Sequence, residues 1–285
     1  MSETLSKRLT IAVELDPPAD DDAAFFMDGV REIRDAGADL ITIADCPVGR
    51  PRADSCVLAA IVQRQYGIDA LPHMTCRDRN LNAIRAALIA LSIEGVHHIL
   101  LVTGDPISPE EHPAVRPVFQ VQSRQLARIV REMNETMFRT PFRIFGALNV
   151  NARHFDHELE RAAEKEESGV TGFLTQPVLS PEALENLKAA RKALKGTILG
   201  GVFPVVSYKN ACFLNEHVAG IRVSPEIIAL YAGKSREEGE RIAVELSLRT
   251  ARDVLPHTDG LYLMTPFRRT ALSAEIVRAV REEYA

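Results

Sequence analysis

Apolar and polar positions along the chain follow two alternating patterns. Short runs rich in β-branched residues, such as LTIAVEL at 9–15, end in proline, glycine or polar residues, as buried strands do. Each run is followed by a longer segment with the periodicity of an amphipathic helix. The runs predict eight strands, at 9–15, 39–45, 68–75, 97–105, 142–149, 170–176, 197–207 and 259–265.

The segments between these runs carry the end signals of helices. Gly37 and Gly67 follow helical stretches and suit the left-handed C-cap, and Ser180 followed by Pro181 is a typical helix start. The expected helices lie at about 22–36, 53–66, 80–94, 121–135, 155–168, from 180 onward, 209–217, 225–252 and 270–282.

Strict alternation of strand and helix predicts a parallel sheet. Eight such units in 285 residues favour an α/β fold of one domain, a single (β/α)8 TIM barrel over residues 1–285. The alternative is an open doubly wound sheet, but the GxGxxG turn expected after its first strand is absent. In a barrel of this kind, chemistry lies where the strands run into the following loops.

Composition narrows the choice of partners and compartment. The net charge is −5 and no basic run occurs, which argues against a nucleic-acid or anionic-membrane partner. No segment is apolar for long enough to be a signal peptide or a membrane span, so a cytoplasmic protein is expected. The four cysteines lack the CxxC spacing of zinc sites, so we expect reduced thiols and no metal centre; they are Cys46, Cys56, Cys76 and Cys212.

Every predicted strand delivers a polar residue or a glycine to the same rim. A role as helix cap or loop residue accounts for some of them singly, but Glu14 and Gln176 are poor capping residues that directly follow apolar runs. His97 and His98, in contrast, begin a strand and belong to the opposite end of the barrel. The strand-end set comprises Glu14, Asp45, His73, Thr75, Gly104, Asp105, Asn149, Gln176, Ser207 and Thr265.

Glu14 is the leading candidate for acid–base chemistry. It ends an apolar strand in VELDPP, where partial burial should raise its pKa and suit a general acid near neutral pH. Asp105, in TGDP, is a second carboxylate on the rim, so one group could donate protons while the other stabilises a cation. A glycosidase could also use two carboxylates, but this chain has no tryptophan with which to stack sugars.

Seven segments at these strand ends resemble the methylenetetrahydrofolate reductase family. In chain order they are VELDPP, ITIADCP, PHMTCRDRN, LLVTGDP, FLTQPV, GVFPVVSYKNA and YLMTPFRR, and they extend over nearly the whole chain. The sequence is most similar to the reductase half of bacterial proteins that join it to a homocysteine methyltransferase.

The resemblance implies a barrel that binds FAD, with FMN as the alternative, and uses NADH or NADPH to reduce 5,10-methylenetetrahydrofolate to 5-methyltetrahydrofolate. It implies catalytic roles for Glu14, which protonates the folate and opens its five-membered ring, and for Asp105, which supports the resulting cation. Folate contacts are implied for Gln176, Tyr208 and Arg268. Flavin contacts are implied for Asp45, His73, Thr75, Thr103, Gly104, Asp105, Ser123, Asn149 and Lys165.

The chain departs from stand-alone bacterial reductases of this family at several flavin-contacting positions. Ala44 and Asp45 replace threonine and tyrosine, Thr103 replaces arginine, and Arg161 and Glu164 replace contacts on the fifth helix. These changes leave the electron donor open, along with a homo-oligomer or a partner redox or methyltransferase subunit. Two other functions also stay open: methyl transfer from methyltetrahydrofolate to a corrinoid protein, and a non-catalytic folate-binding subunit.

Overall fold

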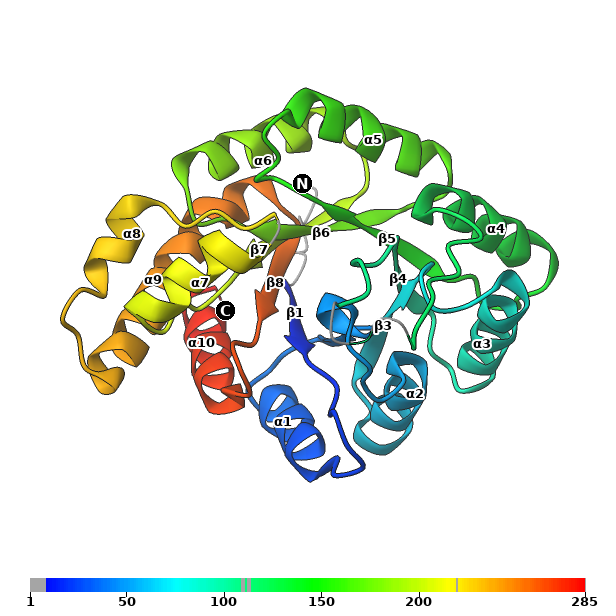
Figure 1. Cartoon of the computed structure of the whole chain (residues 1–285), viewed down its shortest axis with the longest axis horizontal. Coiled ribbons are helices and arrows are strands. Elements are labelled where there is room, and N and C mark those ends of the chain that lie inside the picture. The colour runs from blue at the N-terminus through cyan, green and yellow to red at the C-terminus, as the bar shows by residue number, and fades with distance from the viewer. Residues whose placement is uncertain (1–8, 109–110, 112–113, 219, 285) are drawn as a thin grey trace, which may run out of the picture.

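The computed structural model describes residues 9–108, 111, 114–218 and 220–284. Its strands form one closed parallel barrel in chain order, which confirms the fold expected from the sequence. Figure 1 shows the strands at the centre with the helices around them. The strands are β1 (Thr10–Leu15), β2 (Leu40–Ile43), β3 (Asp69–Thr75), β4 (His98–Val102), β5 (Arg143–Leu148), β6 (Gly172–Pro177), β7 (Thr197–Val202) and β8 (Gly260–Met264).

The helices begin and end close to the predicted signals. Gly67 adopts φ of 62° after α2, and the Ser180 side chain accepts a hydrogen bond from the Ala183 N–H at the start of α6. The helices are α1 (Ala24–Asp35), α2 (Ser55–Tyr66), α3 (Leu81–Ile93), α4 (Ser123–Thr136), α5 (Phe155–Glu167), α6 (Pro181–Ala193), α7 (Tyr208–His217), α8 (Pro225–Leu230), α9 (Arg236–Val254) and α10 (Thr270–Glu283), with short 3-10 turns η1 (Pro47–Gly49) and η3 (Leu255–His257). Within the described ranges, no helix is long and apolar enough to cross a membrane.

Most strands differ from their predicted bounds by one or two residues, but two end three or more residues early, and one helical segment is divided. The fourth strand ends at Val102, because Gly104 takes a left-handed φ of 98° and proline follows soon after. The seventh ends at Val202, two residues before Pro204, which has no N–H to give to a sheet. The segment 225–252 forms α8 and α9, with Gly233 at φ of 70° between them. Residues 109–110 and 112–113 of the loop after β4 lie outside the described residues.

Alternation along the strands produces two apolar cores. One face of each strand packs against the surrounding helices in a large outer core, which includes Ile11, Ile41 and Leu101. The other face fills the barrel interior as an apolar plug of nine buried side chains, which are Ala12, Leu40, Leu71, Leu100, Phe145, Leu174, Leu199, Tyr262 and Met264.

Two aspartate–arginine pairs, which we call fastenings, join strands to helices at the N-terminal end of the barrel. Asp39, just before β2, accepts a hydrogen bond from the Ile11 N–H at 2.8 Å and pairs with Arg281 of α10. Asp259, just before β8, accepts from the Ile198 N–H at 2.9 Å and pairs with Arg191 of α6. Each carboxylate thereby joins a neighbouring strand to an outer helix at the end opposite the rim.

Candidate active site

The C-terminal rim of the barrel encloses a cavity of about 560 Å³. Its position follows from strand alternation, because residues two places beyond the apolar plug point the same way and line the cavity. Thus Ala12 of the plug is followed by Glu14 in the wall, and Leu71 by His73. The polar lining comprises Glu14, Asp16, Asp45, His73, Thr75, Asp105, Thr175, Gln176, Asn210, Tyr262 and Thr265.

Glu14 lies between two side chains from other strands. The Tyr262 hydroxyl donates to its Oε2, and His73 Nε2 lies 3.5 Å from the same oxygen. Burial raises the pKa of Glu14 to about 7; the charge of Asp16 adds to the rise and the hydrogen bond from Tyr262 opposes it. Because the side chain is still 21% exposed and lines the cavity, it can pass a proton to a ligand near neutral pH.

His73 stays neutral beside this carboxyl. Burial lowers the pKa of His73 to about 3, so it forms no charged pair with Glu14 at ordinary pH. Its Nε2 is buried and, within the described residues, has no hydrogen-bond partner. An unpaired buried ring nitrogen is costly, and here it lies in the cavity wall, where a polar atom of a ligand can pair with it.

A β-bulge at the end of β6 brings Thr175 to the cavity beside Gln176. The register between β6 and β7 shifts between Leu174 and Pro177. Thr175 Oγ1 accepts from the Gly201 N–H at 2.7 Å and donates to the Gln176 carbonyl at 2.9 Å, which replaces the regular ladder bond. Both Thr175 and Gln176 consequently line the cavity, whereas consecutive residues of a regular strand point to opposite faces.

Arg77 ties together the loops that follow β2, β3 and β4. It is 1% exposed, donates to the Cys46 carbonyl at 3.1 Å and the Asp105 carbonyl at 3.0 Å, and pairs with the Asp78 carboxylate. The Asp105 side chain is exposed on the rim, where its Oδ2 accepts from the Val48 N–H at 3.0 Å. The second predicted carboxylate therefore sits in the wall of the cavity on a fixed backbone.

Two glycines allow these loops to approach one another. Gly49 has φ of 69°, and a Cβ at this position would lie 2.2 Å from the Pro106 carbonyl oxygen. Gly104 has φ of 98°, and a Cβ there would lie 3.1 Å from the Cβ atoms of both Thr75 and Arg77. Since both positions combine left-handed backbone with close contacts, a larger residue would force the loops apart.

Another part of the wall is apolar and comes from α7 and the segments on either side of it. A cavity with an apolar wall and a few placed polar groups is typical of a small-molecule or cofactor site. The side chains are Phe203, Phe213, Leu214, Val218 and Ile221.

The sequence model of one family, described as methylenetetrahydrofolate reductase, matches residues 1–281. The chain belongs to the methylenetetrahydrofolate reductase family. This confirms the resemblance carried by the strand-end motifs. No curated protein matches the chain in sequence.

Two solved structures share the fold of this family member. An uncharacterized protein from Clostridium thermocellum, which binds two copies of 5-methyl-5,6,7,8-tetrahydrofolic acid, is 13% identical, with a TM-score of 0.67 over 96% of each chain. A 2,3-dimethylmalate lyase of the PEP mutase/isocitrate lyase superfamily is 11% identical, with a TM-score of 0.51 over 96% of this chain and 79% of that one. At such low identity these likenesses show the barrel fold alone.

The flavin contacts that family membership implies fall into two groups. Those in the cavity wall are Asp45, His73, Thr75, Gly104 and Asp105. Those that do not line the cavity are Thr103, Ser123, Asn149 and Lys165. In the second group, Thr103 Oγ1 donates to Ser123 Oγ at 3.4 Å, and Lys165 Nζ donates to the Ala147 carbonyl at 2.6 Å at the end of β5. Burial lowers the pKa of Lys165 from its ordinary value.

Asp45 is already engaged by the protein. Its Oδ2 accepts from Thr75 N at 2.8 Å, from Thr75 Oγ1 at 3.0 Å and from Arg79 Nη1 at 2.7 Å. Asp45, Cys46 and Asp78 lie close enough together to hold a metal ion, but Arg79 and Arg77 already pair with the two carboxylates. Asp45 therefore orders the ends of β2 and β3, and its contact with flavin stays a prediction.

The three predicted folate residues are not gathered in one place. Gln176 lines the cavity, whereas Tyr208 and Arg268 do not. Tyr208 is 50% exposed at the start of α7, and the Arg268 guanidinium lies 5.5 Å from the centre of the Phe25 ring. Contacts of Tyr208 and Arg268 with folate stay predictions, and of the three only Gln176 lines the same cavity as Glu14.

Sequence reasoning missed Tyr262 and Asp16. Tyr262 belongs to the apolar strand GLYLM. Its hydroxyl is the only polar side-chain group in this strand and could have indicated a polar partner in the barrel. Asp16 follows Glu14 by two residues in VELDPP, where Pro17 and Pro18 indicate only a stiff exit from the strand. Both line the cavity and act on Glu14.

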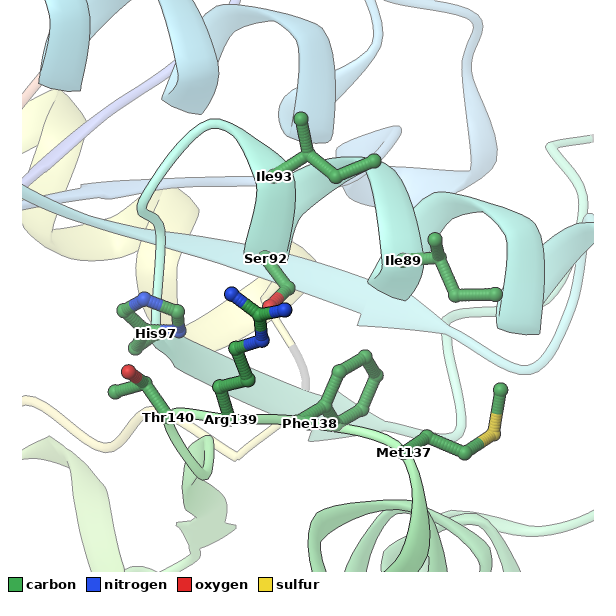
Figure 2. Close-up of a pocket in the computed structure, with 8 residues that line it drawn as sticks. All are labelled: Ile89, Ser92, Ile93, His97, Met137, Phe138, Arg139 and Thr140. Atoms are coloured by element: carbon green, nitrogen blue, oxygen red, sulfur yellow. The ribbon is translucent and has the colours of Figure 1, made fainter.

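A second hollow, of about 490 Å³, lies at the opposite end of the barrel (Figure 2). It is formed by the end of α3, the start of β4 and the segment that follows α4. Its lining includes His97, which confirms that this histidine lies away from the rim. The lining residues are Ile89, Ser92, Ile93, His97, Met137, Phe138, Arg139 and Thr140.

Proposed function

We propose that this protein reduces 5,10-methylenetetrahydrofolate to 5-methyltetrahydrofolate, with Glu14 as the general acid. The observation that carries the proposal is the Glu14 carboxyl in the cavity wall, with a pKa of about 7 and a hydrogen bond from Tyr262. Family membership supports the substrate class. The fold likeness to a barrel that binds 5-methyl-5,6,7,8-tetrahydrofolic acid also supports a folate ligand.

The reaction opens a five-membered ring and adds hydride to the methylene carbon. Glu14 gives its proton to one ring nitrogen as the bond from that nitrogen to the methylene carbon breaks. The carbon is left double-bonded to the other nitrogen as a cation, which the Asp105 carboxylate on the rim stabilises. Hydride addition at this carbon yields the methyl group, and Glu14 regains a proton from solvent, to which it is 21% exposed.

A bound flavin would supply this hydride after its own reduction by NADH or NADPH. The residues in the cavity fit the flavin ring system, because His73 offers an unpaired ring nitrogen and Thr75 and Gly104 line the same wall. Lys165 uses one of its three donors on the Ala147 carbonyl, which leaves the others for a phosphate. FAD and FMN share the ring system and the first phosphate, so the fit holds for either.

An anaerobic titration of the purified protein tests this function. We expect flavin to bind, its absorbance to be bleached by NADH or NADPH, and methylenetetrahydrofolate to restore it. A protein that bound folate but no flavin would be a folate-binding subunit. Methyl transfer from methyltetrahydrofolate to a corrinoid protein without flavin would make it a methyltransferase.

Gln176→Ala is expected to weaken the use of folate by about tenfold, since one hydrogen bond to the ligand is lost. Reduction of flavin by the electron donor should be unchanged, because Gln176 would act on the second substrate. Separate stopped-flow measurements of the two half-reactions check this. Arg268→Ala is the comparison, and we expect a smaller loss because its guanidinium lies over Phe25 outside the cavity. Slower flavin reduction with normal folate kinetics in Gln176→Ala would refute the assignment.

A further inference from the structure

Tyr262 connects the barrel interior to the Glu14 carboxyl. Its side chain is part of the apolar plug and only 6% exposed, yet its hydroxyl reaches Glu14 Oε2. Strands β8 and β1 pair directly, with Met264 opposite Glu14 and Tyr262 opposite Ala12. The phenol therefore comes from one layer deeper in the barrel than the carboxyl, and it approaches Glu14 from the side away from the rim.

The other groups facing Glu14 do not restrain it in this way. His73 of β3 is neutral, and its Nε2 is 3.5 Å from Oε2. Asp16, in the loop after β1, acts by charge repulsion, and Arg52 offsets part of the Asp16 charge. Thr42 lies opposite Glu14 on β2 and carries no charge. Within the described part of the chain, Oε1 of Glu14 makes no hydrogen bond.

We infer that Tyr262 is a positioning residue, whose hydroxyl holds Oε2 of Glu14 toward the barrel interior so that Oε1 presents the proton to the cavity. This inference rests on the proposed role of Glu14 as general acid. A hydroxyl that donates a hydrogen bond to a carboxylate stabilises the charged form. The contact with Tyr262 therefore limits how far burial raises the pKa of Glu14. The phenol remains a donor, because burial and the Glu14 charge raise the pKa of Tyr262 well above its ordinary value.

Tyr262→Phe removes the hydroxyl and keeps the ring in the plug. In the ligand-free protein, NMR of glutamate labelled with carbon-13 at the side-chain carboxyl should show the pKa of Glu14 raised by about one to two pH units. The Glu14 signal is assigned by its loss in Glu14→Gln. In the flavin-loaded protein, the decline of the folate half-reaction at high pH should move upward by the same amount. The rate below that decline should fall, because the acid has lost its fixed orientation.

Tyr231→Phe is the matched control. Tyr231 is also buried, at 2% exposure, and its hydroxyl donates to the Val205 carbonyl rather than to an ionisable group. This variant should lose stability but leave the pKa of Glu14 unchanged. A fluorinated tyrosine at position 262 nearly preserves the side-chain volume and is a stronger donor, so it should lower the pKa of Glu14. The fluorotyrosine variant should thus shift the pKa of Glu14 in the direction opposite to that of Tyr262→Phe. It tests the inference even if Tyr262→Phe does not fold.

An unchanged pKa of Glu14 in the position 262 variants overturns the inference. A shifted pKa with a matching shift of the folate half-reaction supports both the inference and the proposed function. A shifted pKa with no change in the pH dependence of the folate half-reaction supports the restraint by Tyr262 and overturns the acid role of Glu14.

Discussion

Glu14→Gln is expected to slow the folate half-reaction by at least about 100-fold, the lower end of what a positioned general acid contributes. The glutamine keeps the size of the side chain and can still accept a hydrogen bond from Tyr262, but it carries no transferable proton. Flavin binding and flavin reduction by the native electron donor should therefore continue. Anaerobic stopped-flow measurement of each half-reaction separates the two effects.

The pH dependence of the folate half-reaction in the native protein also tests the role of Glu14 as general acid. Glu14 must be protonated to act and its pKa is about 7, so the folate half-reaction should fall as the pH rises through this value. Glu14→Gln should lack this decline. Glu166→Gln is the control, because the Glu166 carboxylate accepts from the Lys195 and Gly196 N–H groups at the other end of the barrel. Equal loss in both half-reactions of Glu14→Gln would indicate a structural role, and an unchanged folate half-reaction would make Asp105 the next candidate.

Arg77→Met is expected to lower the free energy of unfolding by about 3 kcal/mol, the lower end for breaking a buried ion pair. The lower end applies because the partner Asp78 is 29% exposed and keeps some contact with water. The variant also leaves the Cys46 and Asp105 carbonyls without their donor, so the loops after β2 and β4 lose their common anchor. Urea denaturation measures the stability, and the dissociation constant for folate should rise because these loops form part of the cavity.

Arg191→Met provides the comparison for this prediction. Arg191 pairs with Asp259 at the opposite end of the barrel and is 30% exposed, so its loss should cost less and leave folate binding unchanged. If Arg77→Met bound folate normally, the anchored loops would not shape the cavity.

The number and order of the strands could be predicted because a buried strand has a local pattern. The apolar run 9–15 and the alternation that follows it need no knowledge of distant residues. The ends of β4 and β7 were harder to predict. After Val102 the chain continues as TGD, and after Val202 it stays apolar through FPVV, yet neither extension joins the sheet. There the left-handed backbone of Gly104 and the missing N–H of Pro204 decide where the strand ends.

Glu14 and Gln176 could be placed at the rim because each ends an apolar strand, and both line the cavity. The partner of Glu14 could not be found in the same way. Tyr262 lies 248 residues away along the chain and meets Glu14 only because β8 closes the barrel against β1. The bulge that turns Thr175 inward depends on the hydrogen bond between its side chain and the Gly201 N–H of the neighbouring strand. Such a contact does not alter the pattern of apolar and polar residues, so the sequence does not reveal it.

The two aspartate–arginine fastenings at Asp39 and Asp259 have a practical consequence for altering this protein. They secure strands to helices at the end of the barrel that takes no part in the proposed chemistry. Libraries that randomise the apolar wall around Phe213 would leave both fastenings untouched and, with Arg77 kept, should yield mostly folded variants. Ligand preference can thus be altered from the rim without changing the residues that join strands to helices at the other end of the barrel.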